Sequence, residues 1–190
     1  MKLQDRLPDT VQVNGRRIRV DLDFRNVLRM FDILADKGLT PGARETLAAR
    51  CVTKHPVPGV VMAVRALLTQ KESKGAQEHK RVTSFEQDAA LIRAAFWQAY
   101  GIDLWTAKLH YLQFMELLQG LPDDTQYMNI IGIRSRPMPK PTKYNREERD
   151  WLRKAKAQYA IKESEEEKER SYQRDVANVF RGLMSMIPGG

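Results

Sequence analysis

The sequence predicts a mainly helical protein in which a small N-terminal β-hairpin packs on a multi-helix core, followed by a long C-terminal helix or helix pair. Apolar residues recur three and four positions apart over most of the chain, which is the spacing of amphipathic helices. Alternating apolar residues flank an Asn14-Gly15 pair, which is a strong signal for a tight hairpin turn. Three prolines at alternate positions within residues 135–141 prevent a helix there.

The composition suits one domain, or one domain with an appendage. Of the 190 residues, 42% are hydrophobic, and the net charge of +8 allows nucleic acid, an acidic protein or anionic lipid as partner without selecting one. The single cysteine, Cys51, has no neighbouring His or Cys, and we expect a buried, inert thiol in a reducing compartment. The N-terminus lacks the apolar run of a secretory signal, and no window approaches the roughly 18 apolar residues of a membrane span. A soluble, cytosolic protein is expected.

The predicted hairpin covers residues 7–20. Val11 and Val13 precede the turn and Ile18 and Val20 follow it, so the ribbon has an apolar side. A two-stranded ribbon is marginal alone, and we expect it to lean on the helices after it. Its arginines would line the outer face, either as phosphate contacts or, as we favour, as charges that keep an edge strand soluble. These arginines are Arg16, Arg17 and Arg19.

Three helices are predicted before the central stretch. Asp23 is the expected cap of the first, which ends at Gly38. Thr40-Pro41 begins the second, because proline is favoured in the first helical position. Residues 54–59 contain two prolines and a glycine and break the chain before a third apolar helix at 60–68.

The central stretch is the best candidate for the core, because it holds most of the large aromatic residues. Ser84 and Gln87 form the pattern of a capping box, which predicts a helix that starts there and ends at Gly101. A second long helix is predicted over residues 104–118 with Asp103 as its cap. The turn at residues 120–124 ends this helix and starts a third, and Asp123 and Asp124 are interpreted as its cap.

The predicted organisation is a core domain at 1–136, a proline-rich linker at 137–144 and a C-terminal helical extension at 145–190. An exposed, lysine-rich loop interrupts the core at about residues 69–83. Asn145 is the expected cap of the extension. Four apolar residues early in the extension are expected to pack back onto the core, namely Trp151, Leu152, Ala155 and Tyr159.

A second apolar face near the C-terminus has close to ideal helical spacing. Its residues are Val176, Val179, Phe180, Leu183, Met184 and Ile187. We predict that this face is a docking element, either for another protein or for a neighbouring copy of the same chain. The alternative, equally weighted, is that it folds back on the protein's own core.

No motif for catalysis, metal binding or cofactor binding is found, and an enzyme is the least expected class. His110 lies within the predicted 104–118 helix and could meet Glu86 or Asp88 as an acid–base pair. A histidine that is satisfied by structural hydrogen bonds is the favoured interpretation.

Several phrases in the chain, taken together and in order, resemble a small bacteriophage family named for gene product fifteen. They are LPDTV at 7–11 with Asn14-Gly15, DLDFR at 21–25, SFEQDA at 84–89, AAFWQAYGIDL at 94–104, LHYLQF at 109–114, GLPDDT at 120–125 and IGIRS at 131–135. The resemblance covers residues 7–160, and residues 162–190 depart from the family pattern. Its signature positions here are Phe85, Asp88, Tyr100, Gly101, Asp103, Leu121, Pro122, Asp123, Asp124 and Arg134.

The resemblance implies a siphophage tail assembly chaperone. Such proteins bind the long tape measure protein before the tail tube polymerises around it, and they are not retained in the virion. This implies the tape measure protein as partner, with the tail tube protein and self-association as further candidates. It also implies a transient location in the host bacterial cytoplasm, with no cofactor and no membrane.

Two other functions stay open. The charge alone allows a nucleic-acid-binding phage protein, although acidic and basic residues are interspersed rather than segregated. A structural component of the tail tip or connector is the third hypothesis.

Overall fold

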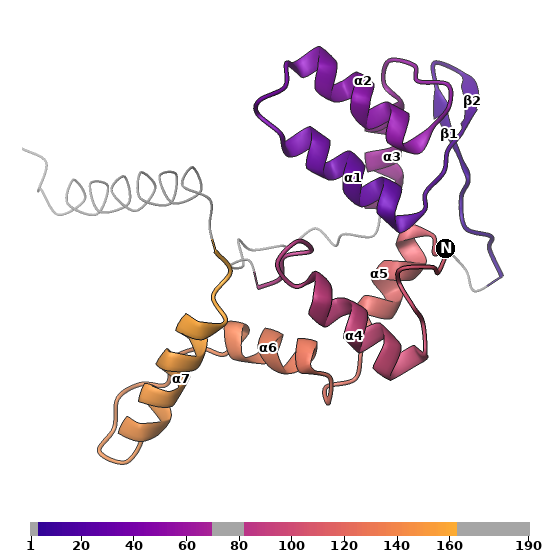
Figure 1. Ribbon diagram of the computed structural model, residues 1–190. Helices are drawn as coiled ribbons and strands as arrows, with labels where there is room; N and C mark the ends of the chain where they lie inside the picture. Colours follow the sequence, from indigo (N-terminus) through magenta and orange to yellow (C-terminus); the bar gives the residue numbers. More distant parts are fainter. Residues whose placement is uncertain (1–3, 70–81, 163–190) are drawn as a thin grey trace, which may run out of the picture. The chain divides into compact units, whose positions relative to one another are not determined.

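The computed structural model describes residues 4–69 and 82–162, and it confirms a mainly helical fold with a small N-terminal hairpin (Figure 1). The elements in chain order are β1 Thr10–Val13, β2 Arg16–Arg19, α1 Phe24–Ala35, α2 Pro41–Val52, α3 Val60–Thr69, α4 Ala89–Tyr100, α5 Tyr111–Gln119, α6 Gln126–Ser135 and α7 Arg146–Gln158. The described residues divide into two compact units. The first comprises 4–69 and 88–129, and the second comprises 82–87 and 130–162.

The hairpin forms as predicted. β1 and β2 pair antiparallel with Val13 opposite Arg16, and the turn residues Asn14 and Gly15 have φ values of 49° and 74°. Positive φ at both positions is what a tight two-residue turn requires. Val11 and Val13 are buried, and the three arginines of β2 are exposed, so the ribbon turns its apolar side toward the helices of the first unit.

Helices α1 to α3 begin where the sequence predicts. The Asp23 carboxylate accepts a hydrogen bond from the Arg25 backbone N–H at 3.0 Å, and the Thr40 hydroxyl accepts one from Ala43 at 3.4 Å. Figure 1 shows α1 and α2 side by side in the first unit. Their facing residues join the hairpin and α3 in one apolar core. The buried members are Val11, Val13, Val20, Leu22, Val27, Met30, Ala48, Ala49, Val52, Val60, Val61, Val64, Leu68 and Leu112.

An aromatic stack joins three helices of the first unit. The Phe24 ring at the start of α1 stacks on Phe114 of α5, with centroids 4.6 Å apart. Phe114 also stacks on Phe96 of α4 at 5.3 Å, and Phe96 meets the edge of Tyr100 at 5.7 Å. Offset and edge contacts of this kind add stability beyond the apolar area that the rings bury.

The predicted helix start at Ser84 is wrong. The Ser84 hydroxyl does accept a hydrogen bond from the Gln87 N–H at 3.3 Å, but it closes a turn, and α4 begins only at Ala89. The Gln87 side chain does not complete the capping box, because its Nε2 donates to the Lys162 carbonyl at 2.8 Å and its Oε1 accepts from the Lys162 N–H at 2.9 Å. At the other end, Gly101 adopts φ 64° and ends α4 as predicted.

The predicted helix over residues 104–118 is also wrong in its first half. Residues 104–106 form a turn, and α5 starts at Tyr111. In a continuous helix the Tyr111 N–H would bond the carbonyl of residue 107, four positions back. It bonds the Leu22 carbonyl at 2.8 Å instead, while the Leu109 carbonyl accepts from the Phe24 N–H at 2.9 Å. These two backbone bonds tie the start of α1 to the start of α5.

The turn at residues 120–124 separates α5 from α6 as predicted, but its aspartates are not the cap. Asp123 and Asp124 are exposed, and the buried Thr125 accepts a hydrogen bond from the Met128 N–H at 3.3 Å. The Thr125 hydroxyl also donates to the Pro122 carbonyl at 3.0 Å. Threonine is a favoured cap residue, and here its hydroxyl serves both the turn and the helix.

The second unit contains the end of α6, the irregular segment 136–145 and α7. Asn145 precedes α7, but its side chain binds the segment behind it, accepting from the Thr142 N–H and donating to the Lys140 carbonyl. Leu152 and Ala155 are buried, whereas Trp151 is exposed, which corrects its assignment to a packed face. The prediction for the C-terminal face at 176–187 lies outside the described residues.

Cys51 is half-buried, and burial raises the pKa of its thiol, although the charge of Arg29 acts in the opposite direction. A raised pKa keeps the thiol protonated and unreactive. Among the described residues, none of the helices has both the length and the apolar character that crossing a membrane requires.

Candidate protein-binding surface

All three tryptophans of the chain are more than half exposed. The relative exposure is 64% for Trp97, 71% for Trp105 and 54% for Trp151. Large aromatic side chains contribute much of the buried apolar area in cores and interfaces. The exposed tryptophans do not contribute that area to the core of this protein. Phe24, Phe96 and Phe114 fill the first unit instead. The exposed tryptophans are therefore candidates for contact with another molecule.

Two of the tryptophans flank an arginine in the first unit. The Arg93 guanidinium lies over the Trp105 ring, with its central carbon 4.4 Å from the ring centroid. Trp97 follows Arg93 by four positions in α4, so both side chains project from the same helix face. A cation over an aromatic face is attracted by the ring's quadrupole, which holds the Arg93 side chain against Trp105.

The exposed residues of α4 around Arg93 and Trp97 are small or uncharged. Ala90, Ala94 and Gln98 are exposed and share the face that carries Trp97. We call the resulting set the tryptophan surface. It consists of Ala90, Arg93, Ala94, Trp97, Gln98 and Trp105.

Asp103 fixes the turn that carries Trp105. Its carboxylate accepts hydrogen bonds from the Trp105 N–H at 2.9 Å and from the Thr106 hydroxyl at 3.2 Å. Its backbone carbonyl accepts from the N–H groups of Thr106 and Ala107. Asp103 thus caps a single turn rather than the long helix that the sequence predicted.

Arg25 ties the same turn to α1. Its guanidinium binds the Asp23 carboxylate through two nitrogens at 2.9 and 3.0 Å, and it also donates to the carbonyls of Trp105 and Ala107 at 3.2 and 3.0 Å. Partial burial alone would raise the pKa of Asp23. Hydrogen bonds from the Arg25 side chain and backbone, with the charges of Arg25 and Lys108, outweigh that effect and hold the pKa below its usual value.

His110 completes this junction and is satisfied by structural hydrogen bonds, as favoured from the sequence. Its Nδ1 accepts from the Leu112 N–H at 3.1 Å, so Nε2 carries the proton and donates to the Pro8 carbonyl at 3.0 Å. The contacts recorded for its ring therefore involve neither Glu86 nor Asp88, the acidic partners considered from the sequence. His110 acts as the cap of α5 and as an anchor for the N-terminal segment.

An open cleft of about 580 Å³ lies at this junction. Its lining groups include Asp9, Asp21, Arg29 and Lys108 beside the bonded Asp23, Arg25 and His110. Side chains of both charges line it. Arg25 holds the turn that carries Trp105 against the start of α1, and His110 holds Pro8 against the start of α5. Within residues 4–69 and 82–162, no cluster of three or more His, Cys, Asp or Glu side chains has the arrangement of a metal site.

The signature residues take mostly structural positions. Tyr100 donates its hydroxyl to the Leu117 carbonyl at 2.9 Å and thereby joins α4 to α5. Leu121 and Asp88 are buried, Phe85 is half-buried in the turn before α4, and the Pro122 carbonyl accepts the Thr125 bonds.

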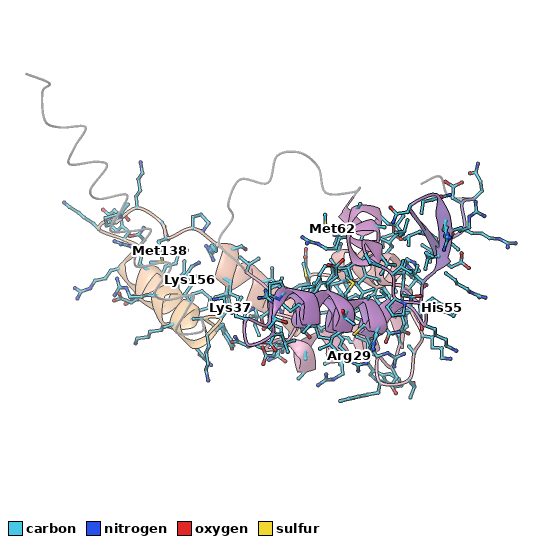
Figure 2. The ribbon with its side chains drawn as sticks, turned by 90° about the horizontal axis from the view of Figure 1, so that it is seen from above. Arg29, Lys37, His55, Met62, Met138 and Lys156 are labelled. Carbon is cyan, nitrogen blue, oxygen red and sulfur yellow. The ribbon has the colours of Figure 1, made fainter. Side chains whose placement is uncertain are left out.

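Arg134 has the broadest role in the second unit. Its Nε donates to the Tyr159 carbonyl at 2.6 Å, and its Nη1 donates to the Val82 carbonyl at 3.0 Å. The backbone carbonyl of Arg134 accepts a hydrogen bond from the Lys156 Nζ at 2.7 Å. Lys156 lies on α7 and is labelled in Figure 2. One arginine therefore connects three chain segments.

Sequence reasoning missed the tryptophan surface. Helical spacing placed Trp105 among core positions and gave no role to Arg93 or Trp97. The signal that was available is the position of Trp97 four residues after Arg93, because a cation and an aromatic on one helix face form a recognisable pair. The contribution of Trp105 depends on the irregular segment 103–110 and could not be read from spacing.

Comparison with known proteins gives one match. The family described as Bacteriophage Gp15 protein matches residues 3–161. No curated protein and no solved structure matches the chain. The matched region ends within one residue of the point where the described structure ends, and it includes every element of both units.

Proposed function

Because the chain belongs to the Bacteriophage Gp15 protein family, we propose that it is a tail assembly chaperone that binds the tape measure protein during tail morphogenesis and leaves before the virion is complete. The observation that carries the proposal is the exposure of all three tryptophans in a protein of this phage family. A chaperone needs exposed apolar surface that is not buried in its own core and can bind another protein.

The physical problem that such a protein solves is aggregation. A long helical protein that waits for its tube exposes apolar surface, and exposed apolar surface associates non-specifically. Tryptophan suits a reversible cover, because one side chain offers a large contact area and pays little conformational entropy on binding. Several copies along one rod would add avidity without a tight individual site.

Co-expression tests the proposal directly. The tape measure protein of the same phage is produced in bacteria with and without this chain, and the soluble fraction and the co-purified complex are measured. The proposal expects soluble tape measure protein only in the presence of this chain. Insoluble tape measure protein in both cultures, with no complex recovered, would refute it.

Purified virions provide the second measurement. A chaperone is expected to be scarce or missing by mass spectrometry, whereas a tail-tip or connector component would be present at a fixed copy number. Recovery at a fixed copy number would favour the structural alternative and contradict the proposal.

The C-terminal face at 176–187 stays a prediction and has its own test. A chain that ends at residue 162 retains both described units. If the face is a docking element, this shorter chain should keep its melting temperature and lose tape measure binding. If it packs on the protein's own core, the melting temperature should fall.

A further inference from the structure

We infer that the tryptophan surface receives an amphipathic helix that carries carboxylate groups among its apolar residues. The inference rests on the proposed function in taking the tape measure protein as the source of that helix. The surface itself is defined by the first unit alone.

The charge of the partner follows from the donors on the surface. In the described part of the chain, the recorded partner of the Arg93 guanidinium is the Trp105 ring, and no hydrogen bond or ion pair is recorded for its nitrogens. The indole N–H groups of Trp97 and Trp105 likewise have no recorded acceptor there. The nearby carboxylate of Asp103 is engaged by its own turn. A partner that buries these donors must replace water with its own acceptors, and carboxylates bind guanidinium in the strongest, bidentate manner.

The helical form of the partner follows from the shape of the surface. Ala90 and Ala94 form a low strip along α4, with Arg93 and Trp97 rising beside it. Small side chains at a contact let two helices approach to the shorter end of the usual separation. A partner helix can then place apolar residues against Trp97 and a carboxylate against Arg93.

Energetic arguments also place the centre of the contact at Arg93 and Trp97. Tryptophan and arginine are the residues most often found to dominate binding energy at protein interfaces. Arg93 is already held against Trp105, so ordering its side chain costs less on binding than it would for a free arginine.

Single-stranded nucleic acid is the competing ligand, because bases also stack on exposed aromatics. Such sites follow the phosphate backbone along a basic groove. The exposed residues of α4 beside Arg93 are Ala90, Ala94, Trp97 and Gln98, which carry no charge. The cations near the Trp105 turn, namely Arg25, Arg29 and Lys108, share their cleft with the carboxylates of Asp9, Asp21 and Asp23 and do not form a basic groove. The arrangement therefore favours a protein helix.

The test uses the full chain and two synthetic helices of about 20 residues, long enough to be helical in solution. Both carry leucine at helical spacing, and they differ in having glutamate or lysine beside it. Binding is measured by titration calorimetry. The wild-type chain is expected to bind the glutamate helix at least about tenfold more tightly than the lysine helix.

Charge reversal makes the test specific. Arg93→Glu should weaken binding of the glutamate helix by about tenfold and strengthen binding of the lysine helix. The matched control Arg50→Glu removes an exposed arginine from α2 and should change neither affinity. Partial unfolding would expose apolar surface to both helices alike, so a reversed preference between the two helices separates the charge effect from destabilisation.

Three results would overturn the inference: equal affinity of wild type and Arg93→Glu for the glutamate helix, no binding of that helix at about 1 mM, or displacement of it by an oligothymidine strand. The experiments distinguish an error in the proposed binding surface from an error in the proposed chaperone function. If wild type and Arg93→Glu keep the tape measure protein equally soluble, the surface is wrong and the function stands. If neither does, but the helix preference reverses, the surface stands and the source of the helix is another protein.

Discussion

The Asp23 carboxylate binds the Arg25 guanidinium through both oxygens, although the two residues are only two positions apart. The same carboxylate caps α1, and the same guanidinium holds the turn that carries Trp105. The ion pair between Asp23 and Arg25 therefore positions the guanidinium that binds the distant Trp105 carbonyl.

This pair predicts a dependence of stability on acid pH. The folded pKa of Asp23 is lowered, so its contribution is complete above the unfolded pKa of about 3.9 and is lost as the pH falls through the lower folded pKa. Asp23→Asn keeps a capping oxygen and should cost about 1 kcal/mol or less at neutral pH, as partly exposed ion pairs do.

Urea unfolding of wild type and Asp23→Asn at pH 7 and at pH values below 4 measures this effect. The difference between the two proteins should shrink as the solution becomes more acidic. A difference that grows with acidity would show that the sign is wrong.

Replacing Phe114 should be far more damaging. Phe114→Ala removes the middle ring of the stack between Phe24 and Phe96 and leaves a cavity, which typically costs about 3–5 kcal/mol. Urea denaturation gives the loss. Tyr144→Ala removes a side chain that is 97% exposed and should change stability by no more than about 0.5 kcal/mol.

Two glycines should respond to alanine with opposite signs. Gly101 has φ 64°, so Gly101→Ala forces a left-handed backbone and should destabilise by about 1–2 kcal/mol, although the space for a methyl group is open. Gly132 lies inside α6, and a methyl group there also meets nothing within 4 Å. Gly132→Ala should stabilise by about 1 kcal/mol, since glycine is a poor helix former. Thermal unfolding of both variants tests the pair, and a shift in the same direction for both would contradict the backbone explanation.

Arg134→Lys should loosen the second unit without unfolding the first. Lysine cannot span the carbonyls of Val82 and Tyr159 as the guanidinium does, and each bond from a charged donor contributes about 1.5–3 kcal/mol. Hydrogen exchange followed by mass spectrometry should show faster exchange in peptides covering 82–87 and 155–162. Arg153→Lys, at an exposed position on α7, provides the control. Unchanged exchange in both peptides would show that Arg134 does not tie the segments together.

Local chemistry made much of the fold predictable. The Asn14-Gly15 turn, the Thr40-Pro41 helix start and the Gly101 helix end each follow from one or two residues whose backbone preferences leave few alternatives. The extent of the family match could also be read from sequence phrases, whose limits of 7 and 160 lie close to the matched residues 3–161.

The errors came from bonds between distant segments. Residues 104–109 keep a helical pattern, but Arg25 occupies the Trp105 and Ala107 carbonyls that a helix would use, and Leu22 takes the Tyr111 N–H. Gln87 is likewise withdrawn from its capping role by Lys162. Periodicity reports which residues share a face, and it does not report which competing hydrogen bond wins.

The backbone bonds between residues 22–24 and 109–111 also order events during synthesis. A ribosome adds roughly 5–20 residues per second, so the beginning of α1 leaves the exit tunnel several seconds before α5 is translated. Throughout that interval the Phe24 ring cannot stack on Phe114, and the Leu22 carbonyl cannot accept its hydrogen bond from the Tyr111 N–H. Residues 22–24 can therefore reach their final hydrogen bonds only after Tyr111 has been added to the chain.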